Sequence, residues 1–100
     1  MQKAASMKEY IGMINEALDE IDDLRASVEF DEEYMMPALD FLDELEAGVK
    51  TLLQSVNDGS YEFKKGELPF MPIVNNVSDH ILPFKHLFKR IELTHKEGLD

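Results

Sequence analysis

The stretch MMPALDFLDELEAGVKTLLQSV, residues 35–56, carries the clearest structural signal in the sequence. Its apolar residues recur at alternating steps of three and four, which places them on one face of an α-helix. This seam has no polar exception, and its positions are Met35, Ala38, Leu42, Leu45, Val49, Leu52 and Val56. We therefore predict an amphipathic helix near residues 32–57, with Asp31 as its N-cap and Glu32 and Glu33 in its first turn.

Two further seams with the same spacing lie on either side. The first runs through Ala4, Met7, Ile11, Ile14, Leu18, Ile21, Arg25 and Val28. The third runs through Phe70, Val74, Val77, Ile81, Phe84, Phe88, Ile91 and His95. These patterns predict helices near residues 3–28 and 70–96. A mean period of 3.5 residues in all three seams is typical of left-handed, bundle-like packing.

The connections between the predicted helices are short. Residues 27–31 leave so little chain that the first two helices are expected to be antiparallel neighbours. Gly59, just beyond the second seam, suits the left-handed position that ends a helix. Residues 61–69 lack helical periodicity, and we expect a loop that is held across the end of the bundle by its aromatic side chains.

Pro83 interrupts the third predicted helix. A proline inside a helix removes one hydrogen bond and clashes with the carbonyl four residues earlier, at Asp79. The heptad phase nevertheless continues through Pro83, so we expect a kinked but continuous helix, with a bend within residues 79–84. The alternative is a break that gives a four-helix arrangement. The favoured fold is a single all-α domain over residues 1–100, an antiparallel up-down-up bundle of three long helices.

Charge and composition limit the classes of function. The chain of 100 residues has a net charge of -11 and no cysteine. Residues 1–58 hold 15 acidic and 4 basic side chains, whereas residues 59–100 hold 6 of each. Direct nucleic-acid binding is not expected without a basic footprint, and an anionic membrane would repel such a chain. The absence of an apolar targeting segment favours a cytoplasmic location.

The sequence shows little that could carry out chemistry. It contains neither a glycine-rich phosphate loop nor a nucleophile elbow, so we expect no enzyme and no cofactor. Glu92 and His95 have the Glu-x-x-His spacing of di-iron bundles, and they are weak metal candidates because the motif occurs once. The favoured explanation of His95 is that it lies near a helix C-terminus, where it interacts with the helix dipole and completes the seam.

Polar residues are expected to gather at one end of an up-down-up bundle. The first and third seams each contain one polar residue, Arg25 and His95. Together with charged neighbours they would form a polar end cluster of Arg25, Asp31, Glu32, Glu33, Glu92 and His95. An ordinary ion-pair network that seals this end is favoured over a binding site.

The function that fits these observations is a non-enzymatic, acidic helical interaction protein. It would act as an adaptor, small chaperone or regulator that binds a protein partner through a face of the bundle, and a specific partner is expected to present a basic face. A homodimer is also compatible with the sequence. The alternative is a small metal-binding bundle in which Glu92 and His95 combine with carboxylates from neighbouring helices.

Overall fold

The computed structural model describes residues 3–30, 38–78 and 82–99, and these residues form four helices and no strand. The helices are α1 (Met7–Phe30), α3 (Ala38–Asp58), α4 (Met71–Asn76) and α5 (Lys85–Glu97). The all-α prediction is confirmed. The predicted N-cap Asp31 and the acidic residues Glu32 and Glu33 lie outside the described residues.

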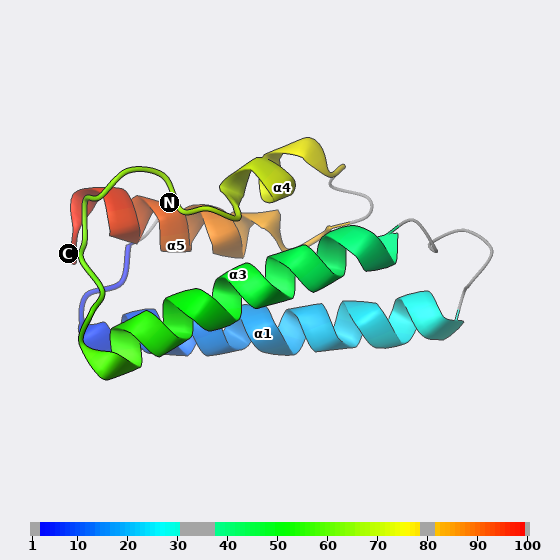
Figure 1. Ribbon diagram of the computed structural model, residues 1–100, viewed down its shortest axis with the longest axis horizontal. Helices are drawn as coiled ribbons and strands as arrows, with labels where there is room; N and C mark the ends of the chain where they lie inside the picture. The colour runs from blue at the N-terminus through cyan, green and yellow to red at the C-terminus, as the bar shows by residue number, and fades with distance from the viewer. Residues whose placement is uncertain (1–2, 31–37, 79–81, 100) are drawn as a thin grey trace.

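The helices are arranged in two layers along an axis of 42 Å (Figure 1). Helices α1 and α3 form an antiparallel pair, and α4 and α5 lie across one side of it. Contacts of α5 with α1, and of α4 with both α3 and α5, join the layers. One side of the α1–α3 pair is thus covered by the other two helices.

The core follows the predicted seams with one shift. On α3 the seam positions Leu42, Leu45, Val49 and Leu52 are all buried. On α1 the buried centre combines seam positions with the positions beside them, because α1 contacts α5 as well as α3. Its members are Tyr10, Met13, Ile14, Ala17, Ile21 and Leu24.

The prediction of one continuous helix over residues 70–96 is wrong, and the alternative break is what the structure shows. Helix α4 ends at Asn76, and Val77 is extended, with φ −92° and ψ 141°. Helix α5 begins only at Lys85, directly after Pro83 and Phe84. The break spares the chain the lost hydrogen bond and the ring clash that Pro83 would cause inside a helix. The predicted bend at 79–84 falls partly outside the described residues.

The break also changes the direction of the last long helix. Ala4, just before α1, donates a backbone hydrogen bond of 3.0 Å to Thr94 near the end of α5. Helix α5 therefore runs antiparallel to α1 and parallel to α3 (Figure 1). The predicted up-down-up order, in which the third helix runs parallel to the first, is wrong for this reason.

The end of α3 follows the prediction. Gly59 has φ +83°, the left-handed conformation that an L side chain rarely adopts. The Tyr61 amide donates to the Ser55 carbonyl at 3.1 Å, six residues back, and so satisfies one of the last carbonyl groups of the helix. Residues 61–69 then continue as a loop whose half-buried aromatics, Tyr61 and Phe63, pack against the core.

Gly48 lets the segment before α4 approach α3 closely. A Cβ atom at Gly48 would lie 3.0 Å from the Phe70 Cβ and 3.2 Å from its Cδ2. Phe70 itself is buried and makes an edge-to-face contact with Phe88 of α5, with ring centroids 5.9 Å apart. Because Gly48 has no side chain, the start of α4 can pack closely against α3.

We expect Gly48→Ala to destabilise the protein. Alanine improves intrinsic helix propensity by about 1 kcal/mol, but here its methyl group meets the base of a buried Phe70 side chain that has little room to move. Gly12→Ala in α1 is the matched control, because nothing lies within 4 Å of its added Cβ. Urea unfolding should show a gain of up to about 1 kcal/mol for the control. Equal gains in both variants would contradict the close approach.

Pro83→Ala is expected to lower stability by roughly 0.4–1 kcal/mol, because proline restricts the unfolded chain at a position outside any helix. Thermal unfolding of the variant and the wild type measures this difference. A variant more stable than the wild type would indicate strain at Pro83 and favour a continuous helix.

Candidate functional site

Arg25 lies toward the C-terminal end of α1 and forms ion pairs with two residues of α3. Its Nη1 lies 2.7 Å from the Asp43 Oδ1, and its Nη2 lies 3.5 Å from the Glu46 Oε2. Both acidic residues belong to the first half of α3. Arg25 therefore joins the two helices of the antiparallel pair.

The structure does not bring Arg25 together with Glu92 and His95. The last turns of α1 and of α5 lie at opposite ends of the molecule (Figure 1). Glu92 and His95 lie instead beside the start of α1, where Tyr10 is linked to His95 through Tyr61. The reversal between α4 and α5 is the cause. Asp31, Glu32 and Glu33, the other members of the predicted cluster, lie outside the described residues.

A chain of hydrogen bonds connects three elements at the end where α5 finishes. The Tyr10 and Tyr61 hydroxyl oxygens are 2.8 Å apart, and the Tyr61 hydroxyl lies 2.5 Å from the His95 Nδ1. Burial raises the pKa of Tyr10 far above its ordinary value, and burial also raises the pKa of Tyr61. Both hydroxyls are therefore neutral near pH 7 and can donate hydrogen bonds.

The loop over residues 59–70 is also fixed to α5 through its backbone. The Lys64 amide donates to the His95 carbonyl at 2.6 Å, and Lys64 has a positive φ of 67°. The Leu68 amide donates to the Glu92 Oε1 at 3.3 Å. Two successive turns of α5 thus hold two points of the loop.

Glu92 is the least satisfied polar group at this end. Its residue exposure is 8 %, and its Oε2 has no hydrogen-bond partner among the described residues. Burial raises the pKa of Glu92, and the Leu68 hydrogen bond and the nearby Lys96 offset that rise only in part. The Glu-x-x-His spacing singled out Glu92, but not its burial, because the loop that covers it is remote in sequence.

The described residues contain no group of three or more histidine, aspartate and glutamate side chains placed to hold a metal ion. Oε1 of Glu92 and Nδ1 of His95 are each engaged with the loop, through Leu68 and Tyr61. Within the same part of the chain, no helix has both the length and the apolar composition that crossing a membrane requires.

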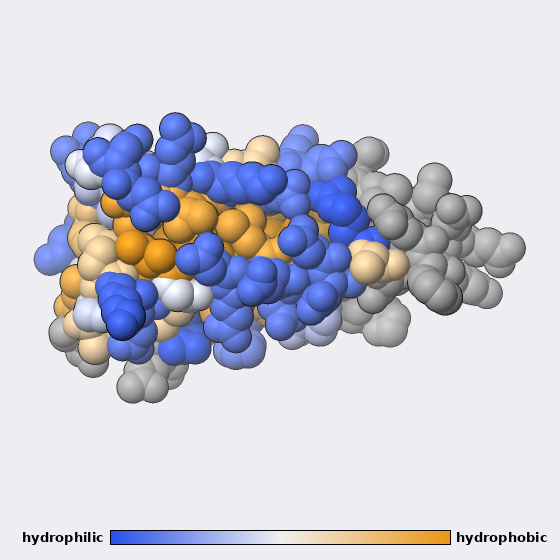
Figure 2. All heavy atoms as spheres, turned by 90° about the horizontal axis from the view of Figure 1, so that it is seen from below, coloured by the Kyte–Doolittle hydropathy of each residue, from blue (hydrophilic) through white to orange (hydrophobic). Residues whose placement is uncertain are grey.

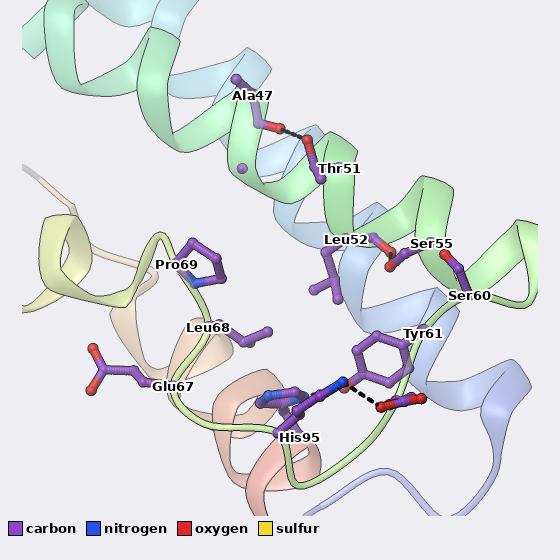
Figure 3. Close-up of a pocket in the computed structure, with 13 residues that line it drawn as sticks. Ala47, Thr51, Leu52, Ser55, Ser60, Tyr61, Glu67, Leu68, Pro69 and His95 are labelled. Carbon is purple, nitrogen blue, oxygen red and sulfur yellow. Dashed lines mark hydrogen bonds and ion pairs between the residues drawn. The ribbon is translucent and has the colours of Figure 1, made fainter.

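A groove of about 560 Å³ separates α3 from the 59–70 loop. One wall is a row of mostly small side chains on α3: Ala47, Gly48, Thr51, Leu52 and Ser55. The other wall is the loop, and His95 of α5 closes the groove between them. Figure 3 shows Leu52 and Leu68 projecting toward each other from the two walls, with the Tyr61 hydroxyl near the His95 ring. Sequence reasoning missed this groove, because its walls meet only through tertiary packing.

A second surface lies between α1 and α3, on the side away from α4 and α5. Figure 2 shows a continuous apolar stripe along this side, bordered on both long edges by polar side chains. The Arg25 contacts identify the flank of α1 that faces α3, and Leu18 and Ile11 precede Arg25 by one and two heptads on that flank.

The antiparallel register adds α3 to the same stripe. Arg25 of α1 pairs with Glu46 of α3. Because the helices are antiparallel, seven residues back from Arg25, at Leu18, corresponds to seven residues forward from Glu46, at Leu53. Ile11, Leu18 and Leu53 are half-buried, and Met7, one turn before Ile11, is 37 % exposed. We refer to Met7, Ile11, Leu18 and Leu53 as the α1–α3 face.

Replacing Glu92 with Gln should remove a loss of stability at high pH. Because burial raises the folded-state pKa above the ordinary value of 4.5, folding favours the protonated carboxyl. This contribution is complete below the unfolded pKa and is lost as the pH rises through the folded one. Urea unfolding of both proteins from about pH 4 to pH 8 should therefore show the variant gaining on the wild type as pH rises. The exposed Glu97, changed to Gln, is the control. A difference that does not change with pH would contradict this account of Glu92.

Comparisons of the chain with protein-family models, with curated proteins and with solved structures found no match. The features of the molecule that bear on its function are the groove, the α1–α3 face and the charge of the chain.

Proposed function

We propose that this protein is a non-enzymatic interaction protein that binds a basic, amphipathic helix of a partner protein along the α1–α3 face. The observation that carries the proposal is the apolar stripe of Figure 2, bordered by polar side chains on two parallel edges. A groove between two helices that leaves apolar side chains partly open suits the apolar face of a third helix.

The charge of the chain favours a basic partner. The whole acidic surplus belongs to residues 1–58, the part of the chain that contains α1 and α3. Asp43 and Glu46 lie beside the stripe, and their ion-pair partners among the described residues are Arg25 and Lys50. Lysine and arginine residues flanking the apolar stripe of a partner helix would be attracted to this surface.

A second copy of the chain is the less favourable occupant. Two copies that met through this face would bring together two surfaces of the same negative sign, which costs free energy at low salt. Self-association is therefore kept as an outcome of the test below.

The test uses a helical peptide of about 18 residues with a leucine stripe flanked by lysines, and a second peptide with glutamates at the lysine positions. We expect the protein to bind the lysine peptide and not the glutamate peptide in fluorescence anisotropy titrations. Affinity should fall at least tenfold as salt rises from about 0.05 to 0.5 M, because salt screens the charge pairs. Failure to bind the lysine peptide at about 1 mM, or equal binding of both peptides, overturns the proposal.

Variants locate the binding surface. We expect Ile11→Gln and Leu18→Gln each to weaken peptide binding by at least about tenfold, the loss of one buried aliphatic contact. Leu93→Gln, a half-buried leucine on α5, is the matched control. Circular dichroism verifies that each variant is folded. If sedimentation shows a dimer that the same two variants dissociate, the occupant is a second copy and the proposed partner is wrong.

A further inference from the structure

The groove between α3 and the 59–70 loop is separate from the α1–α3 face. Thr51 and Ser55 line the groove from one flank of α3, whereas Leu53 lies on the flank that faces α1. The volume of about 560 Å³ lies within the range of small-molecule sites, which is roughly 300–1,000 Å³. The groove is therefore a second candidate binding site.

Its walls favour an apolar stem. Leu52 and Leu68 face each other across the groove, and Pro69 and Ala47 extend the apolar lining (Figure 3). Hydrogen-bonding groups gather at one place, where Tyr61 and His95 meet. An apolar wall with a few convergent polar groups is the usual form of a site that fixes the orientation of a small ligand.

The charges around the groove favour a cation. Its lining contains Glu62, Glu67 and Lys65, and Lys65 is paired with Glu62 at 2.9 Å. Glu92 does not line the groove itself, but its Oε1 accepts a hydrogen bond from the amide of Leu68, which does. The other oxygen of this carboxyl has no partner among the described residues, although the residue is more than nine-tenths buried. A buried carboxylate oxygen of this kind is satisfied best by a positive charge.

We propose that the groove binds a small organic amine, with its ammonium group at the end lined by Tyr61 and His95 and its apolar or aromatic stem between Leu52 and Leu68. The ammonium group adds positive charge near the Glu92 carboxyl, beyond that of Lys96. The carboxylate attracts the ammonium group through space, and this attraction is stronger than in water because the protein between them has a lower dielectric constant.

The titratable and charged groups around Glu92 agree with this assignment. Tyr10 from α1 and Tyr61 from the loop are neutral, and Glu67 adds negative charge. On α5 itself, Lys96 and His95 only partly offset the effect of burial on Glu92. Burial favours the protonated carboxyl, and a bound cation favours the carboxylate, so amine binding is expected to strengthen as pH rises.

Three indole compounds of matched shape provide the test: indole-3-ethylamine, indole-3-ethanol and indole-3-propionate. Their dissociation constants are measured by NMR titration of the full chain. We expect the amine to bind at least tenfold more tightly than the alcohol, and the propionate to bind most weakly. The amide shifts should centre on Thr51 and Leu68. Equal affinity for amine and alcohol, shifts elsewhere on the surface, or no binding of the amine would overturn the proposal.

Variants separate the groove from general attraction to an acidic protein. Glu92→Gln should reduce the affinity for the amine to that for the alcohol and leave alcohol binding unchanged, whereas Glu97→Gln, which removes the same charge elsewhere, should change neither. Thr51→Trp should fill the groove and weaken amine and alcohol binding alike. Lys50→Trp, on the neighbouring exposed position of α3, is its control. An unchanged amine affinity in Glu92→Gln overturns the role of the carboxylate.

A lysine side chain of a partner protein carries the same chemical group. The lysine peptide that tests the α1–α3 face is therefore added to the amine complex. We expect the peptide not to displace the amine, because the two surfaces lie on different flanks of α3. Displacement would assign the groove to a partner's lysine and overturn the small amine as its ligand, whereas failure of the peptide to bind at all concerns only the α1–α3 face.

Discussion

The rest of the structure depends on a backbone constraint at Pro83. A proline nitrogen has no hydrogen to donate, and its ring would collide with the carbonyl four residues earlier in a helix. Helix α4 ends before this proline, at Asn76, and α5 begins after it, at Lys85. This interruption lets the chain reverse, so that α5 packs antiparallel to α1. As a result, the last turns of α5 meet the 59–70 loop and the first turn of α1 at one end of the molecule.

At that end lie several buried polar groups, most of which have hydrogen-bond partners. The Thr94 hydroxyl accepts from the Ala4 amide and donates to the Arg90 carbonyl, at 3.0 and 2.9 Å. Tyr10, Tyr61 and His95 satisfy one another in a chain. The Glu92 Oε2, which has no hydrogen-bond partner among the described residues, therefore lies at an end of the molecule where the other buried polar groups are paired. A single unmatched atom in such a network costs more than one at the surface, because the surroundings that strengthen good hydrogen bonds also increase the cost of a missing one.

Much of the fold could be predicted from the sequence, because hydrophobic periodicity reports which face of a helix is buried. Leu42, Leu45, Val49 and Leu52 show this on α3. The end of that helix was predictable for another reason, because Gly59 readily adopts the left-handed conformation found there. Periodicity does not report whether two helical segments are joined. Phe70 and Val74 in one segment and Phe88 and Ile91 in the next all enter the core, so the heptad phase runs through Pro83 although the helix does not. The direction of the last helix, and therefore the position of His95, could not be predicted from the periodicity.

The candidate site was predictable only as single residues, and α3 shows why. Its buried centre faces the core, one flank faces α1 and the other faces the loop, so that two surfaces of different character share one helix. The flank toward α1 contains leucine and acidic side chains, whereas the flank toward the loop consists mostly of small residues. Gly48 belongs to the second flank, and its missing side chain admits Phe70 and thereby sets how closely the loop approaches. The width of the groove is thus fixed by a contact between residues 22 positions apart in the chain. The pattern along the sequence places Phe70 on a seam but gives no sign of its contact with Gly48, and the width of the groove depends on that contact.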